Sequence, residues 1–271
     1  MVDTDGKVIP DFTIVLGVDR KHLFQLEHTF PTWKRHKPSM LERPMIVFYD
    51  HEQLDPSDVR KVIDHHDMIM IPWPLAGVEY EGGNDKFTNA RRYRMLSGFV
   101  HVPAKVVKTL WWLKIDTDAI AHGMDDWIDS SWWADDPIII SPGWPYTKPP
   151  NQMVLLDEWV EREKDKLIDF YERTEPLDMF PKPGSDRLPH KRIGTWCAFF
   201  KTSFTQYASM LAEQTCGLGK LPVPSQDSYL WYLATRMGRG IRRENMKKRG
   251  WVLFATMPNI KRSAAEAMAN G

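Results

Sequence analysis

The fold is decided by one stretch of the sequence, Leu110-Trp111-Trp112-Leu113-Lys114-Ile115-Asp116-Thr117-Asp118-Ala119-Ile120. This mostly apolar run ends in two carboxylates separated by one residue, and it predicts a buried β-strand. Because side chains alternate between the two faces of a strand, Asp116 and Asp118 are expected on one side and Thr117 on the other. The sequence therefore predicts two acidic groups in one small volume.

Two neighbouring carboxylates repel each other unless a cation lies between them or one of them binds a proton. Oxygen ligands at the end of a strand suit hard divalent ions such as Mg²⁺ or Mn²⁺, which complete their coordination with water and substrate phosphates. Asp116 and Asp118 are therefore candidate metal ligands. The alternative is turn and cap chemistry, in which Asp116 begins a turn and Asp118 caps the next segment, because a lone D-x-D motif also occurs by chance.

The composition predicts a folded protein without a polyanionic partner. The 271 residues are 42% hydrophobic, and 36 basic residues balance 36 acidic ones. This zero net charge argues against nucleic acid as a partner. Two cysteines are too few for a disulfide framework, which favours a reducing compartment. With no signal-like N-terminus and no apolar run long enough to form a transmembrane segment, we expect a cytoplasmic protein, and peripheral membrane association is compatible with this.

The chain before the central stretch alternates between strand and helix patterns. Strands are predicted at 12–19, 45–50 and 68–72, and helices at 21–34, ending near Pro31, and at 56–63. This alternation is typical of a parallel sheet covered by helices. Such sheets bind ligands beyond the carboxyl ends of their strands, so Asp19, Asp50 and Trp73 are expected to cluster there, at the same edge as Asp116 and Asp118.

The second half of the chain predicts further helices and strands. Helices are expected at 124–128, 154–172, 204–213 and 225–237, and strands at 137–141 and 193–201, with proline-rich loops at 142–150 and 176–192. Within the 193–201 strand, Gly194 permits another backbone segment to approach closely. Most of the twelve tryptophans are expected to fill the core.

A helix predicted at 85–100 displays three arginines, Arg91, Arg92 and Arg94. Arginine near a binding site can hold a phosphate or a carboxylate through two parallel hydrogen bonds. A solvent-exposed helix face with ordinary ion pairs explains the same pattern. The sequence leaves both interpretations open.

Asp227 lies in the first turn of the 225–237 helix, for which Ser225 is a suitable N-cap. The helix macrodipole favours the ionised carboxylate at this place. Asp227 can therefore accept a proton or a hydrogen bond from a substrate hydroxyl. Stabilisation of the helix start alone also explains an aspartate here.

Four features together resemble the nucleotide-sugar glycosyltransferases of the GT-A fold: the buried first strand, the strand ending in Asp116-Thr117-Asp118, the 193–201 strand and the helix start Ser225-Gln226-Asp227. The resemblance covers residues 12–237. It implies an α/β protein with a mostly parallel, Rossmann-like central sheet flanked by helices. It implies one domain over 12–262, with a nucleotide-binding half (12–120) and an acceptor-binding half (121–262), between tails at 1–11 and 263–271.

The resemblance also implies metal-dependent transfer of a sugar from a nucleotide-diphosphate sugar, a UDP-sugar in preference, to a hydroxyl acceptor such as a glycan. Asp118 would bind Mn²⁺ or Mg²⁺ directly, and Asp116 would contact the ribose or the metal. The residues implied at the nucleotide sugar are Val18, Asp19, Arg91, Arg94, Asp116, Thr117 and Asp118.

At the acceptor, the resemblance implies contacts with Trp144, Trp196 and Asp227, and Asp227 would be the general base of an inverting enzyme. One feature departs from the family, in which a histidine from the C-terminal part often ligates the metal. The last histidine here is His190, so Asn259 or water would complete the coordination.

Three other classes of protein share parts of this pattern. A phosphohydrolase of the haloacid-dehalogenase type would use Asp116 as its nucleophile, but its D-x-D ends the first strand of the fold, and here three strands precede it. A nucleotidyltransferase would have a glycine-rich loop after the first strand, and 19–22 contains no glycine. A non-catalytic carbohydrate-binding protein with the same fold remains an alternative, which the acidic pair together with Asp227 argues against.

Overall fold

A seven-stranded sheet forms the centre of the computed structural model. The structure describes residues 6–73, 95–145, 151–167, 191–217, 221–222, 226–236 and 240–253. The strand order is β10-β6-β9-β4-β1-β2-β3. The strands are β1 (Phe12–Val18), β2 (Met45–Tyr49), β3 (Met68–Pro72), β4 (Trp111–Ile115), β6 (Ile139–Ser141), β9 (Cys197–Lys201) and β10 (Ile241–Arg243). Strand β9 runs antiparallel to its neighbours β4 and β6. The other neighbouring pairs, β4–β1, β1–β2, β2–β3 and β10–β6, are parallel. The predicted α/β fold with a mostly parallel sheet is confirmed.

Strand β4 is buried between β1 and β9, as its apolar sequence predicts. All five of its residues are buried. Trp112 stacks on Phe200 of β9, with ring centroids 4.6 Å apart. Burial of this aromatic surface is a large contribution to stability, because each such side chain removes 150–250 Å² of surface from water by rough estimate.

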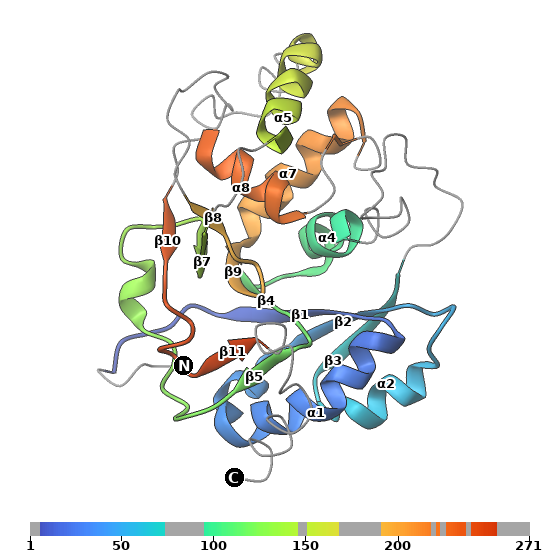
Figure 1. The fold of residues 1–271 in the computed structure, drawn as a ribbon, viewed down its shortest axis with the longest axis vertical. Helices are drawn as coiled ribbons and strands as arrows, with labels where there is room; N and C mark the ends of the chain where they lie inside the picture. The colour runs from blue at the N-terminus through green and yellow to red at the C-terminus, as the bar shows by residue number, and fades with distance from the viewer. Residues whose placement is uncertain are drawn as a thin grey trace.

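Helices cover both faces of the sheet (Figure 1). Helices α1 (Arg20–His36) and α2 (Pro56–Val62) lie on one face, and α4 (Val102–Val106), α7 (Thr202–Thr215) and α8 (Gln226–Arg236) on the other. Helix α5 (Asn151–Arg162) packs against α8. The tryptophans fill both layers as predicted, and those almost fully buried are Trp33, Trp112, Trp127, Trp132, Trp159, Trp231 and Trp251. No helix within the described part of the chain is long and apolar enough to cross a membrane.

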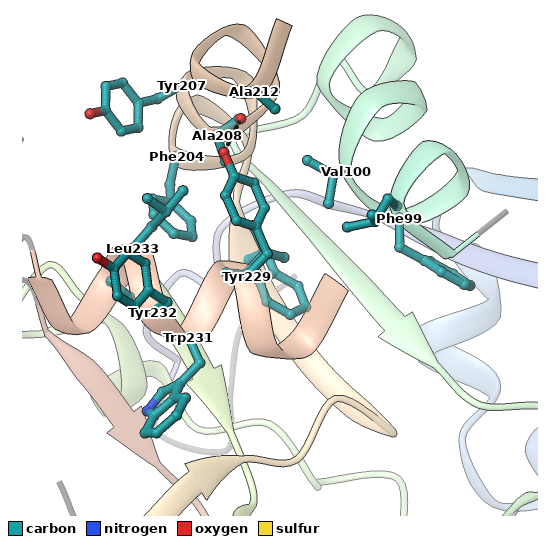
Figure 2. Close-up of a cluster of buried hydrophobic side chains, with 14 of the residues drawn as sticks. Phe99, Val100, Phe204, Tyr207, Ala208, Ala212, Tyr229, Trp231, Tyr232 and Leu233 are labelled. Carbon is teal, nitrogen blue, oxygen red and sulfur yellow. Dashed lines mark hydrogen bonds between the residues drawn. The ribbon is translucent and has the colours of Figure 1, made fainter. Parts of the chain in front are cut away.

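Buried aromatic side chains hold helix α8 against α7 (Figure 2). The hydroxyl of Tyr229 donates a hydrogen bond to the backbone oxygen of Ala208, at 2.8 Å. The hydroxyl of Tyr232 donates to a carboxylate oxygen of Asp157 in α5, at 2.7 Å. Because Tyr229 is close in sequence to Asp227, these contacts fix the helix start that contains Asp227.

Two small antiparallel sheets flank the central one. Strand β5 (Ala119–Ala121) pairs with β11 (Trp251–Leu253), and β7 (Gly143–Pro145) pairs with β8 (Lys191–Ile193). Strand β5 also contacts helix α1, where the indole of Trp33 donates to the oxygen of Ala119 at 2.7 Å. The backbone immediately after Asp118 is therefore held from two sides.

Two predicted helices differ from the structure. Helix α1 passes through Pro31 and ends at His36, because Phe30, Thr32 and Trp33 are buried and this packing offsets the hydrogen bond that proline cannot make. The segment 124–128 is not helical. A 3₁₀-helix, η3 (Ser130–Trp133), begins after it, where the side chain of Asp129 accepts a hydrogen bond from the Ser131 amide.

The predicted strand at 193–201 is divided into β8 and β9. Between them the Gly194 amide donates to the backbone oxygen of Pro142 at 2.7 Å, and a Cβ at position 194 would lie 3.0 Å from that oxygen. The close approach expected at Gly194 is thus present, and it lies where the chain leaves β8.

The end of the predicted 85–100 helix is a π-helical turn, η2 (Ser97–His101), and the residues before Met95 lie outside the described part.

Gly250, which precedes β11, is expected to be intolerant of any side chain. Its φ is +83°, and a Cβ there would overlap the backbone oxygen of His122, whose amide donates to the Gly250 oxygen at 2.8 Å. Gly123 is a matched control, because its φ is +71° and a Cβ there would meet nothing within 4 Å. In urea denaturation we expect Gly123→Ala to lower the free energy of unfolding by about 1 kcal/mol. Gly250→Ala should lower it by several times as much, and equal losses would contradict this packing.

Asp19 caps helix α1, and its charge should stabilise the fold in a pH-dependent way. Burial raises the pKa of Asp19, but hydrogen bonds and charge from His22 outweigh this and lower the pKa to about 2. A carboxyl with a depressed folded-state pKa stabilises fully above its unfolded pKa of about 4, and this is lost as the pH falls toward 2. We expect Asp19→Asn to be less stable than the wild type in urea denaturation at about pH 7, by less than about 1 kcal/mol because Asp19 is partly exposed. The difference should shrink below about pH 4, and a pH-independent difference would contradict a stabilising role for the charge of Asp19.

Candidate active site

A pocket of about 680 Å³ opens at the carboxyl ends of the parallel strands. Asp19 follows β1, Asp116, Thr117 and Asp118 follow β4, and Asp227 comes from the first turn of α8. All five line this pocket. The volume is in the range of small-molecule binding sites. Three separate chain segments thus bring predicted site residues together.

The acidic pair lies in a turn and not in a strand, which corrects the prediction from strand alternation. Strand β4 ends at Ile115, and the backbone amide of Ala119 donates to the backbone oxygen of Asp116 at 3.0 Å, which closes a turn. Both carboxylates nevertheless line the pocket. Burial and the neighbouring charge of Asp116 raise the pKa of Asp118 above its ordinary value. This shift is expected of two like charges held close together without a cation.

Lys114 is a site residue that the sequence reasoning missed. It is 4% exposed, and its ammonium forms an ion pair with Asp116. The ammonium also donates to the backbone oxygen of Thr195 at 3.1 Å and lies 4.8 Å from the centre of the Phe99 ring. The available signal was a lysine inside an otherwise apolar strand, two positions before the first aspartate.

The side of the pocket at β1 is polar. The Asp19 carboxylate accepts from the His22 amide at 2.9 Å and lies 2.7 Å from Nδ1 of the same histidine. The Thr117 hydroxyl donates to Oε1 of Gln25 at 2.7 Å. Lys21 also lines the pocket, whereas Val18 is fully buried in β1 beside it.

Part of the pocket lining is apolar. Trp73, after β3, and Phe99, in the π-helical turn, line the pocket together with Met95. Two glycines permit this packing, because a Cβ at Gly17 would lie 2.9 Å from the Phe99 ring and a Cβ at Gly98 would lie 2.6 Å from the Trp73 indole nitrogen. The pocket therefore offers apolar surface for a ring as well as charged and hydroxyl groups.

Gln226 is a second residue that the sequence reasoning missed. It lines the pocket beside Asp227, is 2% exposed, and its Nε2 lies 3.5 Å from the Thr195 hydroxyl. Its Oε1 has no hydrogen-bond partner among the residues that the structure describes. A buried acceptor without a donor is costly, which makes this oxygen a candidate acceptor for a hydrogen bond from a bound ligand.

The other predicted site residues do not line the pocket within the described part of the chain. Trp196 is 6% exposed and packs in the core, while its backbone oxygen accepts from the Asp116 amide at 2.7 Å. Trp144 lies in β7, and its side chain is outside the described part. Arg91, Arg94 and Asn259 are also outside it. Their predicted roles stay predictions.

The pocket fits a metal ion that is shared with a ligand. Within the described ranges, no three His, Cys, Asp or Glu side chains converge on one point. Mg²⁺ and similar ions are usually held by one or two carboxylates together with water and substrate phosphates. Asp116 and Asp118 are the two carboxylates that could hold such an ion, and burial and the charge of Asp116 raise the pKa of Asp118, as is expected where no cation is bound.

Comparison with known proteins gives a likeness of structure and not of sequence. No protein-family profile matches the chain, and no curated protein matches it significantly. Core-mannan synthase A from Aspergillus fumigatus, in its Mn/GDP form, is similar with a TM-score of 0.52 and 10% identity, over 87% of this chain and 71% of that one.

Two further structures have lower scores. They are a mannosyltransferase from S. cerevisiae in complex with GDP (TM-score 0.49, 9% identity, 86% of this chain and 71% of that one) and the galactosyltransferase LgtC with donor and acceptor sugar analogues (TM-score 0.44, 11% identity, 87% and 74%). The likeness to core-mannan synthase A shows that this chain has the fold of the GT-A glycosyltransferases.

Proposed function

We propose that the protein is a glycosyltransferase, which moves a sugar from a nucleotide-diphosphate sugar to a hydroxyl group of an acceptor such as a glycan. One observation is the main support: three segments far apart in sequence place Asp19, the Asp116–Asp118 turn and Asp227 around a single pocket at the carboxyl ends of the strands. The GT-A fold adds to it, although a fold by itself does not establish a function.

In this proposal the donor lies in the pocket at the carboxyl ends of the strands. The nucleoside lies against Asp19, Thr117 and the backbone of Val18, whose side chain is buried, and the diphosphate lies over the acidic turn. Asp116 and Asp118 hold Mn²⁺ or Mg²⁺ there. When bound, such an ion stabilises the negative charge that develops on the departing diphosphate. Arg91 and Arg94 are proposed to contact the same diphosphate.

The acceptor enters from the side of α8. Asp227 accepts the proton of the attacking hydroxyl in an inverting reaction, which requires it to lie within hydrogen-bond distance of that hydroxyl. Gln226, whose Oε1 is buried and aimed at no described donor, accepts a hydrogen bond from a sugar hydroxyl. Trp144 is proposed at the acceptor, whereas the side chain of Trp196 packs in the core and is not proposed there.

The haloacid-dehalogenase alternative disagrees with the described site. In that fold the D-x-D follows the first strand, whereas the strand before Asp116 is the fourth in chain order and lies at the middle of the sheet. A carbohydrate-binding protein without activity stays an alternative that the next two experiments separate from an enzyme.

Calorimetric titration with UDP and GDP, each with and without Mn²⁺, tests the donor site. We expect one nucleotide to bind in a metal-dependent way, and Asp118→Ala to weaken this binding at least about tenfold, because charge-assisted contacts of this kind contribute about 1.5–3 kcal/mol. Asp135→Ala is the matched control, since Asp135 is exposed and outside the pocket. Binding that is unchanged in Asp118→Ala would contradict the metal role.

Release of nucleoside diphosphate from a panel of UDP- and GDP-sugars, with oligosaccharide acceptors present, tests Asp227. We expect Asp227→Asn to lower the transfer rate about 10²- to 10⁴-fold, as loss of a general base does, and to leave nucleotide binding unchanged. Asp135→Asn should keep full activity. Full transfer by Asp227→Asn would exclude the proposed base, and nucleotide binding without any transfer in the wild type would favour the non-catalytic alternative.

A further inference from the structure

The acidic turn contains its own counter-ion. We infer that Lys114 is a positioning residue that holds and neutralises Asp116, so that a divalent cation enters the site together with the diphosphate and not on the empty protein. This inference rests on the proposed function, because it specifies how the donor and the metal bind.

The geometry directs the lysine charge onto Asp116. An ammonium has three N–H donors. One contacts the Asp116 carboxylate, and another donates to the Thr195 oxygen at 3.1 Å. The ammonium also lies over the Phe99 ring, 4.8 Å from its centre, in a cation–π contact. Protein groups therefore surround the ammonium, and Asp116 is the carboxylate that it neutralises.

Burial keeps this arrangement in place. The side chain of Lys114 is 5% exposed, whereas that of Asp116 is 41% exposed and faces the pocket. A buried ammonium that loses its carboxylate partner is strongly disfavoured, so Lys114 holds Asp116 in one orientation. The exposed side of Asp116 remains able to accept a hydrogen bond from a bound ligand.

The charges near the turn then predict the order of binding. Lys114 and Asp116 sum to zero, which leaves Asp118 as the unneutralised carboxylate of the turn. A divalent cation that approaches Asp116 also meets the positive charge of Lys114 at short range, and this repulsion is appreciable at the effective dielectric of a protein surface. A bound diphosphate adds negative charge and oxygen ligands at the same point. The cation should therefore bind weakly alone and tightly with a nucleoside diphosphate.

The test measures Mn²⁺ binding without nucleotide, from the decrease of the electron paramagnetic resonance signal of free Mn²⁺. We expect weak binding by the wild type. Lys114→Met should bind Mn²⁺ at least about tenfold more tightly, because both carboxylates become available to the cation. Adding Asp116→Asn to Lys114→Met should remove this gain. Lys108→Met is the matched control, since Lys108 is exposed and the change in net charge is the same.

A merely structural lysine would not produce tighter metal binding when it is removed. Unchanged or weaker Mn²⁺ binding by a folded Lys114→Met would therefore overturn the inference, as would tight Mn²⁺ binding by the wild type without nucleotide. If circular dichroism shows that Lys114→Met does not fold, Lys114→Gln replaces it, because the amide keeps hydrogen-bond donors without the charge.

A second arm adds UDP or GDP to the wild type. If Mn²⁺ and nucleotide bind together but Lys114→Met shows no gain, the inference fails and the proposed function stands. If neither nucleotide binds under any condition, the proposed function fails, whatever the metal titration of Lys114→Met shows.

Discussion

The ion pair between Lys114 and Asp116 is the contact on which the arrangement of the site depends. An ammonium buried in a central strand costs free energy unless a carboxylate and other acceptors compensate it. Lys114 lies in strand β4, between β1 and β9, and is 4% exposed, and Asp116, which follows the strand, is the carboxylate that compensates its charge. The core of the protein and the acidic turn therefore share one electrostatic element.

Local sequence patterns were enough to predict much of the fold. The strands at the beginning of the chain are apolar and not alternating, as buried parallel strands are, and their order in the sheet puts Asp19 and the D-x-D at one edge. The prediction that Asp116 and Asp118 lie together at the carboxyl-end edge of the sheet is confirmed, but the reason given for it, alternation along a strand, was wrong. Alternation along a strand does not apply, because the backbone turns at Asp116. The carboxylates share the pocket because of that turn.

The contacts that the sequence did not reveal are those between distant segments. Lys114 donates to Thr195, 81 residues later in the chain, and no local pattern encodes this pairing. Trp33, in helix α1, donates to the backbone oxygen of Ala119 in β5. This contact explains why the helix continues past Pro31, because residues beyond the proline are buried and hydrogen-bonded. In the sequence Gln226 is only one residue of a predicted helix start. Its burial and its place in the pocket depend on the packing of that helix against distant segments.

The pocket lies where the two core layers of the protein meet at the edge of the sheet. Phe99 and Trp73 belong to the core on the side of α7 and α8, whereas Ile115 and Ala119, on either side of the acidic turn, belong to the core on the side of α1. Each layer fixes its own part of the site, through the hydrogen bond of Tyr229 to Ala208 on one side and that of Trp33 to Ala119 on the other. Both layers pack on the strands of one sheet, so the two hydrogen bonds hold Asp227 and the acidic turn on a common support. In the proposed reaction this support holds the general base and the leaving-group site in place before the substrate binds, as preorganised catalysis requires.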